Sequence, residues 1–203
     1  MTLIEEDALS IDAAREEAAP LISEMAGEVS LDRFGAQGRG FLIYPMEPER
    51  YAHRIRGGHG IFLLRAGGET VGFIAGVGSD IIEREVRQAQ HYNNMYALVT
   101  AWAHHHRIQR YFFLDQMVIR PERQNEGLGA RLFTLFRRWL RGAVFIDVLE
   151  EPVENPRLKW WKAQGFERVT EIREVGREGL FDSEPLCWGI YVLPRIDRCG
   201  LVS

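Results

Sequence analysis

The segment from Tyr111 to Gly142 constrains the fold most, because it joins an apolar strand to an amphipathic helix through a turn that holds two glycines. Residues 111–119, YFFLDQMVI, are nearly all apolar, as expected of a strand that is covered on both faces. Pro121 lacks the N–H that a sheet ladder needs, so we expect the strand to end before it. Beyond the turn, apolar residues recur at helical spacing and predict one buried stripe, formed by Leu128, Leu132, Leu135, Phe136, Trp139 and Leu140.

The turn itself, QNEGLGA at 124–130, has the features of an anion-binding site. Two glycines at the start of a helix let the backbone approach a ligand closely and leave several N–H donors unpaired. These donors, together with the positive end of the helix dipole, favour phosphate. A dinucleotide-binding Rossmann turn would need a third glycine, and a Walker loop would need Gly-Lys-Ser/Thr; neither pattern is completed here.

The turn and a second block resemble the acyl-CoA site of the GNAT superfamily of N-acetyltransferases. In that family, a strand ending in aliphatic-x-Pro precedes Gln or Arg, two residues, Gly, one residue, and Gly or Ala. Here residues 119–121 are Ile-Arg-Pro, and Gln124, Gly127 and Gly129 follow at the matching offsets. After the next predicted strand, NPRLKWWKAQGF at 155–166 is similar to the family's asparagine, helix, aromatic pair and Gly-Phe.

This resemblance implies that acetyl-CoA is the cofactor and that main-chain groups bind most of it. The backbone of 117–119 would hold the pantetheine arm, and the N–H groups of 125–130 would hold the diphosphate. Asn155 would help to fix the arm; it also fits a helix N-cap, because Pro156 follows it. The alternative is an ordinary glycine turn before a helix. The candidate cofactor-binding residues are Met117, Val118, Ile119, Gln124, Asn125, Glu126, Gly127, Leu128, Gly129, Ala130, Asn155 and Trp161.

Asp115 is the candidate catalytic base. Acyl transfer from a thioester needs a neutral amine, so a positioned proton acceptor assists it. An ionised carboxylate inside an apolar strand is costly unless it is paired or hydrated, and strand alternation puts Asp115 on the same face as Met117 and Ile119. By resemblance, polyamine acetyltransferases of the superfamily carry a glutamate at this place. A structural carboxylate that accepts hydrogen bonds from loop N–H groups is the alternative.

Trp161 departs from the family pattern. The family usually has a tyrosine there, whose phenol protonates the departing thiolate, whereas an indole does not titrate usefully. Water, the substrate ammonium, Tyr191 or Cys187 would then supply the proton, or transfer is slow or lost. Core packing is the alternative interpretation for Trp160 and Trp161.

Composition bounds the remaining possibilities. With 203 residues and 46% apolar content, the chain can bury one full core, so we expect a single domain over 1–203. A net charge of −4 does not predict the basic surface that binding to nucleic acid needs. Cys187 and Cys199 form no disulfide framework, no apolar run is long enough to span a membrane, and the acidic start lacks a signal-peptide pattern. A cytoplasmic location is expected.

Local patterns predict the other elements. A helix is expected over 11–29, capped by Asp12 and interrupted or kinked by Pro20. A second helix is expected from Ile81 to Ala97, or on to Ala103. The remaining predicted elements are a helix at 48–56, hairpin strands at 61–65 and 71–77, strands at 143–149, 166–175 and 186–193, and loops at 30–40 and 176–185.

Three polar or aromatic groups invite functional interpretations. Consecutive side chains point in different directions, which disfavours a metal site built from His104, His105 and His106. Aromatic side chains between the hairpin and the apolar strand fit core packing better than an acceptor pocket or a dimer face; they are Tyr92, Tyr96 and Trp102. Acidic residues near the end of the strand at 143–149 fit a solvated face better than an amine-attracting one; they are Asp147, Glu150, Glu151 and Glu154.

The order of strands and helices predicts a mixed α/β (α+β) domain. The resemblance implies the GNAT type, with a mixed, mostly antiparallel sheet that is splayed at its middle and flanked by helices. The expected activity is transfer of an acetyl group from acetyl-CoA to a primary amine of a small molecule or peptide, by direct attack in a ternary complex. The alternatives are an acyl-CoA-binding regulatory or structural domain with weak or lost transfer, and an acetyltransferase for protein N-termini or lysines. No metal, nucleic acid or membrane is expected as a partner, and a homodimer is compatible with the sequence.

Overall fold

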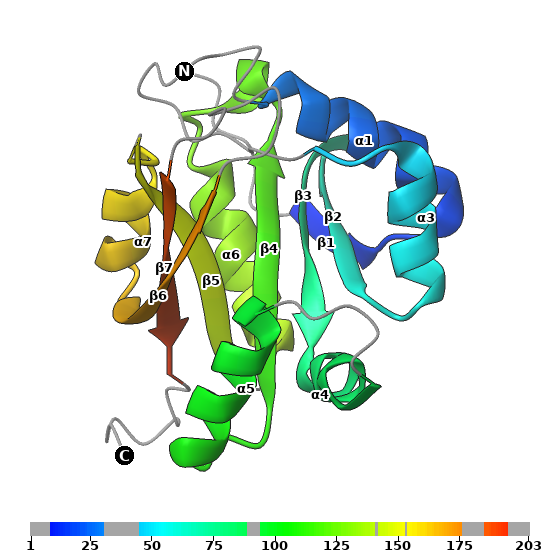
Figure 1. Cartoon of the computed structure of the whole chain (residues 1–203). Helices are drawn as coiled ribbons and strands as arrows, with labels where there is room; N and C mark the ends of the chain where they lie inside the picture. The colour runs from blue at the N-terminus through cyan, green and yellow to red at the C-terminus, as the bar shows by residue number, and fades with distance from the viewer. Residues whose placement is uncertain are drawn as a thin grey trace. The chain divides into compact units, whose positions relative to one another are not determined.

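The computed structural model describes residues 9–30, 45–88, 94–140, 142–152, 154–175 and 185–194. Its seven strands form one sheet with the order β1-β2-β3-β4-β5-β7-β6 (Figure 1). The described residues group into two compact units: unit 1 holds those up to Gly76 together with Gln116–Leu140, and unit 2 holds those of Val77–Asp115 and those after Leu140. Strands β3 and β4 contribute residues to both units.

The elements alternate between strands and helices along the chain. The strands are β1 (Leu9–Ala13), β2 (Gly60–Ala66), β3 (Glu69–Gly78), β4 (Tyr111–Ile119), β5 (Ala143–Glu151), β6 (Glu167–Val175) and β7 (Pro185–Leu193). The α-helices are α1 (Ala19–Glu28), α3 (Pro48–Arg56), α4 (Ser79–Gln88), α5 (Asn94–His105), α6 (Leu128–Trp139) and α7 (Leu158–Ala163), and short 3-10 turns lie at η2 (Glu16–Ala18) and η3 (Pro121–Arg123).

In unit 1, helices cover both faces of the β1–β2–β3 antiparallel ribbon. Helices α1 and α3 pack on one face, where Leu63 and Phe73 lie in a core cluster with Ile22 and Met25. Neighbouring residues of a strand point to opposite faces, so Phe62 faces the other side, where its ring packs 5.8 Å from that of Phe136 on α6. The two-sided cover explains why β2 and β3 are apolar along nearly their whole length.

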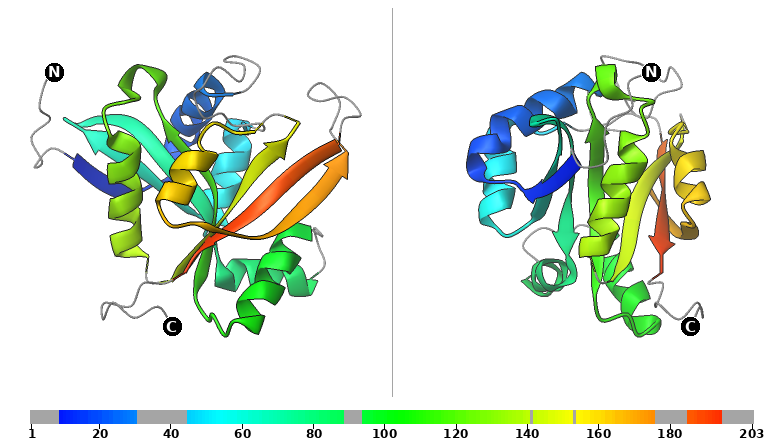
Figure 2. Two further views of the ribbon diagram at one scale, coloured as in Figure 1. Left: turned by 90° about the vertical axis from the view of Figure 1, so that its left-hand side faces the viewer. Right: turned by 180° about the vertical axis from the view of Figure 1, so that it is seen from behind.

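In unit 2, β5, β7 and β6 run side by side as an antiparallel sheet (Figure 2). Helix α5 packs on one face through Trp102, whose ring is 5.5 Å from Phe145. Helix α7 covers the opposite face, where the Lys162 amine lies 5.7 Å from the ring of Tyr191. Tyr191 pairs with Ile146, the neighbour of Phe145, and therefore points away from α5.

The pairing of β4 with β5 is short. These strands pair in parallel, but within the described residues their register ends at Leu114 and Ile146. Both strands continue beyond that point, β4 to Ile119 and β5 to Glu151. The strand order and pairings confirm the predicted mixed, mostly antiparallel sheet that is flanked by helices.

Most of the predicted elements are present, with two corrections. The helix predicted over 11–29 is wrong in its first part: β1 pairs with β2, so Asp12 lies in a strand opposite Leu63 and caps no helix. Pro20 does not interrupt a helix either, because it occupies the first turn of α1, where proline's missing N–H costs nothing. The helix expected from Ile81 falls on α4 and α5. Tyr92 lies outside the described residues, and so do the loops predicted at 30–40 and 176–185, except for Ser30 and for Pro185, which begins β7.

The buried stripe of α6 also differs from the prediction. Leu128, Leu132 and Phe136 are buried as expected, and Phe133 joins them. Trp139 does not belong to the stripe, because 58% of it is exposed, although one ring face packs 4.5 Å from Phe62. Leu135 and Leu140 are only partly buried.

Candidate functional site

The turn between β4 and α6 is built to present N–H donors. Asn125 and Gly127 both have left-handed backbones, with φ of 69° and 77°. Within the described part of the chain, the N–H groups from Asn125 to Ala130 donate to no backbone carbonyl. The next N–H along the chain, that of Arg131, donates to the Gly127 carbonyl at 3.2 Å. A Cβ atom added at Gly127 would have no atom within 4 Å. The turn therefore presents several N–H donors at a helix N-terminus, an arrangement that fits an anionic group such as a diphosphate.

Gln124 holds this turn against the end of β4. Its side-chain Nε2 donates to the Ile119 carbonyl at 3.0 Å, while its Oε1 is buried and accepts no hydrogen bond from the described residues. The Gln124 side chain thus fixes the turn to the end of β4. Gln124 is the first residue of the predicted acyl-CoA pattern, and its role here is structural.

Two arginines flank the turn, and neither is among the residues predicted for the site. Arg120 donates to Glu28 at 2.7 Å and to Glu24 at 3.1 Å, and only 14% of its side chain is exposed. Arg123 donates from Nε and Nη2 to the carboxylate of Glu126 at 3.0–3.1 Å. These bonds raise the pKa of Arg123 and lower that of Glu126. The signal that could have found Arg123 is its position next to Gln124, in the pattern itself.

The strand residues before the turn alternate in exposure. Asp115, Met117 and Ile119 are partly exposed, whereas Gln116 and Val118 are buried. The buried side of this part of β4 is tied to α3, because the Tyr51 hydroxyl donates to Gln116 Oε1 at 2.7 Å. On the partly exposed side, a Cβ added at Gly129 of α6 would lie 3.8 Å from Met117 and 3.9 Å from Ile119, an ordinary contact distance. The half-exposed face therefore carries three of the predicted site residues.

In unit 2, Asn155 stabilises the turn that leads into α7. Its side-chain oxygen accepts from the Arg157 N–H at 3.0 Å, and its carbonyl accepts from the Leu158 N–H at 2.9 Å. The predicted N-cap is corrected in position, because α7 begins at Leu158 and not at Pro156. The capping chemistry is nevertheless the expected one, a side-chain oxygen that satisfies an N–H before the first helical turn.

Trp161 is a packed residue. Only 8% of it is exposed, and its ring contacts Trp160 and Phe166 at centroid distances of 4.6 and 5.3 Å. These are edge-to-face contacts, the arrangement aromatic pairs prefer in cores. The packing interpretation accounts for Trp161, whose indole supplies no acid.

The other proton donors considered, Tyr191 and Cys187, are also unsuited to the task. Both are buried, and the Tyr191 hydroxyl donates to Glu150 in a short hydrogen bond. Burial, and the neighbouring carboxylate, raise the pKa of Tyr191 far above its ordinary value, and burial raises the pKa of the Cys187 thiol. A donor with a raised pKa and no access to solvent protonates a departing thiolate poorly.

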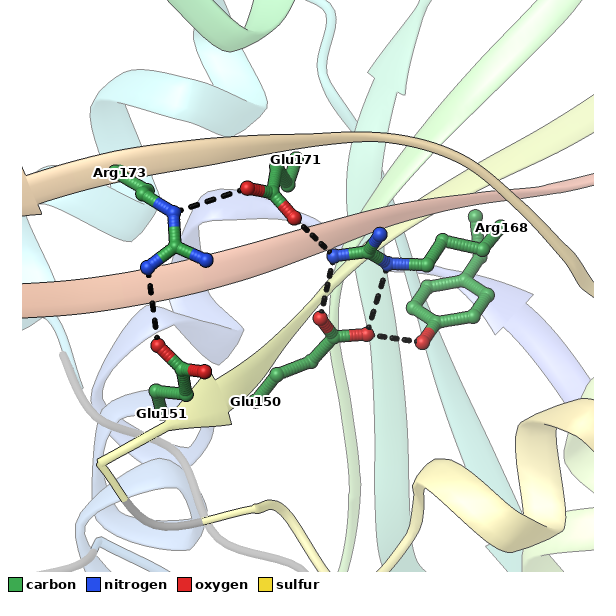
Figure 3. Close-up of polar contacts among 6 residues, drawn as sticks. Glu150, Glu151, Arg168, Glu171 and Arg173 are labelled. Carbon is green, nitrogen blue, oxygen red and sulfur yellow. Dashed lines mark hydrogen bonds and ion pairs between the residues drawn. The ribbon is translucent and has the colours of Figure 1, made fainter.

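The acidic residues at the end of β5 are neutralised by arginines of β6 (Figure 3). Glu150 accepts from Arg168 at 2.7 Å, and Glu151 accepts from Arg173 at 3.1 Å. Glu171 lies between the two arginines and binds both, at 2.6 and 2.9 Å. This chain of alternating charges leaves Glu150 and Glu151 poorly suited to attract a cationic amine.

The histidine and aromatic groups of α5 have ordinary partners. His104 lies 3.6 Å from Glu83, and the His106 ring stacks on Trp102 at 3.9 Å. Tyr96 packs on Phe113. Among the residues that the structure describes, no group of three metal-ligating side chains comes together.

Comparison with known proteins identifies the architecture. No family model and no curated protein matches the chain. Solved structures do match: an acetyltransferase from Thermus thermophilus is 20% identical, with a TM-score of 0.55 over 92% of this chain and 97% of that one. A Drosophila melanogaster polyamine N-acetyltransferase that forms N-acetylagmatine is 12% identical, with a TM-score of 0.58 over 92% and 99%. Arabidopsis thaliana Naa50, solved with the bisubstrate analogue CoA-Ac-MVNAL, is 12% identical, with a TM-score of 0.54 over 92% and 98%.

This chain has the GNAT fold. The resemblance predicted from two short blocks is confirmed at the level of architecture, since the similarity extends over nine-tenths of the chain. At identities this low, the GNAT fold alone does not assign an acceptor or a mechanism. No helix among the described residues is long and apolar enough to cross a membrane.

Proposed function

We propose that the protein is an acetyl-CoA-dependent N-acetyltransferase that acts on a primary amine of a small molecule or peptide. The observation that carries this proposal is the turn at 124–130, with left-handed Asn125 and Gly127 and a run of N–H groups that have no backbone acceptor among the described residues. Such a turn offers a diphosphate several donors and the positive end of a helix. The GNAT fold of solved acetyltransferases supports the assignment.

In this proposal, acetyl-CoA supplies the activated acyl group, and the residues of this chain orient the reactants and move protons. The N–H groups of Asn125 to Ala130 bind the diphosphate, and main-chain groups of 117–119 align the pantetheine arm. Asp115, half-exposed on the same side of β4 as Met117, accepts a proton from the acceptor ammonium, directly or through water. Asn155 and Trp161 remain candidates for cofactor contacts by resemblance.

The proton for the departing thiolate then comes from water or from the acceptor ammonium. Trp161 does not titrate, and Tyr191 and Cys187 are buried with raised pKa values. We propose direct attack in a ternary complex, because this route asks the protein only to position two reactants and to accept one proton. We also propose that the protein acts in the cytoplasm, a reducing compartment in which the buried thiol of Cys187 would stay free.

Two substitutions test the assignment. Asp115→Asn is isosteric and should lower turnover, with little change in acetyl-CoA affinity, because the amide cannot accept a proton. Equal turnover of both proteins across the pH range would remove Asp115 from this role. Gly127→Glu should abolish acetyl-CoA binding in calorimetry, since it adds bulk and negative charge to the turn. A folded variant that still binds would refute the diphosphate site.

A second function, acyl-CoA binding with weak or lost transfer, is favoured by one observation. The position where the family usually has a tyrosine acid holds the packed Trp161, and the two alternative donors, Tyr191 and Cys187, are buried. Acetyl-CoA binding without thiol release, against both small amines and peptides, would support this function. Release with peptides alone would instead identify a protein acetyltransferase.

A further inference from the structure

Arg123 and Glu126 form an ion pair inside the proposed diphosphate turn. Both residues of the pair lie within four positions of Gly127 in the sequence. The Arg123 guanidinium donates to the Glu126 carboxylate from Nε and Nη2 at 3.0–3.1 Å. The third nitrogen, Nη1, makes no hydrogen bond with the described residues, and its nearest carboxylate is that of Glu69 at 3.8 Å. One edge of the guanidinium is thus hydrogen-bonded to Glu126, and the other edge faces Glu69 in a longer ion pair.

The composition of the turn makes this pair unusual. Glu126 is the only acidic residue between Gln124 and Ala130, so it places a negative charge where the turn otherwise offers N–H donors. A ligand carrying a diphosphate would be repelled by a free carboxylate at this point. Arg123 cancels that charge in the absence of ligand.

The ion pair is weak enough to be exchanged. The Glu126 side chain is 38% exposed and that of Arg123 is 23% exposed, and partly exposed pairs of this kind contribute little to stability. A phosphate group carries more charge than a carboxylate and accepts the same fork of donors. Arg120 cannot serve in its place, because two carboxylates and the Thr70 carbonyl already hold it.

We infer that Arg123 is a diphosphate ligand. Without ligand its guanidinium is paired with Glu126, and on binding it changes partner to the diphosphate. The charge of Glu126 therefore sets the affinity of the turn for its anion. This inference rests on the proposed function, because the anion it names is the diphosphate of acyl-CoA. In the ligand-bound protein the guanidinium of Arg123 leaves the carboxylate and binds a phosphate oxygen. Glu126 then turns outward to solvent.

A double-mutant cycle on CoA affinity tests the inference by calorimetry at low ionic strength. Removing the charge in Glu126→Gln should tighten CoA binding by roughly three- to ten-fold. Arg123→Gln should weaken it by about ten-fold. The deciding comparison is Arg123→Gln in the Glu126→Gln background, where the loss of about ten-fold should persist.

The contrary result is equally definite. If Arg123 only screens Glu126, its replacement will have no effect once Glu126 is neutral, and that outcome overturns the inference. Dephospho-CoA, which keeps the diphosphate and lacks the 3′-phosphate, should show the same loss as CoA; a loss confined to CoA also overturns the assignment to the diphosphate.

Two controls separate this test from the proposed function and from general charge effects. Arg65→Gln removes an equal charge from an exposed pair with Asp12 on other strands of unit 1, and it should leave affinity unchanged. A change as large as that of Arg123→Gln would contradict a local contact. Failure of the wild-type protein to bind CoA at all would refute the proposed function itself, whereas equal binding by all variants refutes only the role of Arg123.

Discussion

Gly189 on β7 is a position where a single methyl group should disturb unit 2 directly. A Cβ atom there would lie 2.7 Å from the Glu150 Cδ and 2.7 Å from the Tyr191 ring, and it would also overlap a carboxylate oxygen of Glu150. Ordinary packing contacts begin at about 3.5 Å, so Gly189→Ala must push Glu150 or the Tyr191 ring aside. Tyr191 is fully buried and cannot move easily.

The expected cost follows from what Glu150 holds. Displacing its carboxylate removes the acceptor of the buried Tyr191 hydroxyl and the bidentate partner of Arg168. An unsatisfied buried hydroxyl costs about 1–3 kcal/mol, and overpacking adds about 1–3 kcal/mol. We therefore expect Gly189→Ala to lower the free energy of unfolding by about 2–6 kcal/mol, a large part of the stability of an ordinary domain.

Urea denaturation monitored by tryptophan fluorescence measures this loss. Gly27→Ala in α1 is the matched control, because no atom lies within 4 Å of the added Cβ, and the helix should gain up to about 1 kcal/mol. Adding Glu150→Ala to Gly189→Ala should cost less than the sum of the single losses, since the overlapping carboxylate is gone. A Gly189→Ala protein within about 0.5 kcal/mol of wild type would refute the reasoning from packing.

Three further perturbations probe single interactions. Gly127→Ala should lower the unfolding free energy by about 1 kcal/mol from left-handed backbone strain alone, since nothing obstructs the methyl group; denaturation that shows no loss would contradict the strained turn. Asn155→Ala should cost about 1 kcal/mol by removing the acceptor of the Arg157 N–H, whereas a neutral effect would show that the cap is dispensable. The pKa of Tyr191 is raised in the folded state, so its contribution to stability is fully present below about pH 10 and is lost as pH rises further. The free energy of unfolding, measured from about pH 9 to 11, should therefore fall less steeply with pH for Tyr191→Phe than for wild type. Equal slopes for the two proteins would argue against the buried phenol.

The strand, turn and helix at 111–139 could be predicted from the sequence because each depends on local chemistry. The apolar run fixes β4, Pro121 ends it, and the glycine turn precedes a periodic helix. The hairpin at Gly67 and Gly68 is equally local, since both glycines have positive φ in a two-residue turn. Local signals of this kind carried the resemblance, and the GNAT fold followed from it.

Strand β1 could not be predicted in the same way. Residues 11–18, IDAAREEA, favour a helix by composition, yet Leu9 to Ala13 pair with Phe62 to Ala66 of β2. The free energy of that pairing comes from residues some fifty positions away, and a prediction from neighbouring residues alone does not take them into account. Tertiary pairing overrode helix propensity.

The pairing of charges was also beyond local patterns. Arg168, Glu171 and Arg173 face Glu150 and Glu151 because β6 lies beside β7, and β7 beside β5. Only the register of three strands brings these side chains together, so the acidic cluster seen in the sequence gave no sign of its arginine partners. Trp139 shows the same limit: helical spacing puts it on the apolar side of α6, yet its ring contacts Phe62 of β2 while 58% of the residue stays exposed.

The most direct test of the proposed function is thiol release from acetyl-CoA in the presence of polyamines, amino acids, aminoglycosides, arylamines and short peptides, with acetyl-CoA binding measured on the same preparation. We expect binding, and a saturable rate with one class of primary amine that falls in Asp115→Asn. A protein that binds acetyl-CoA and releases no thiol with any of these amines would contradict the transferase and favour a CoA-binding domain. A folded protein that does not bind acetyl-CoA would contradict the diphosphate turn on which the proposal depends.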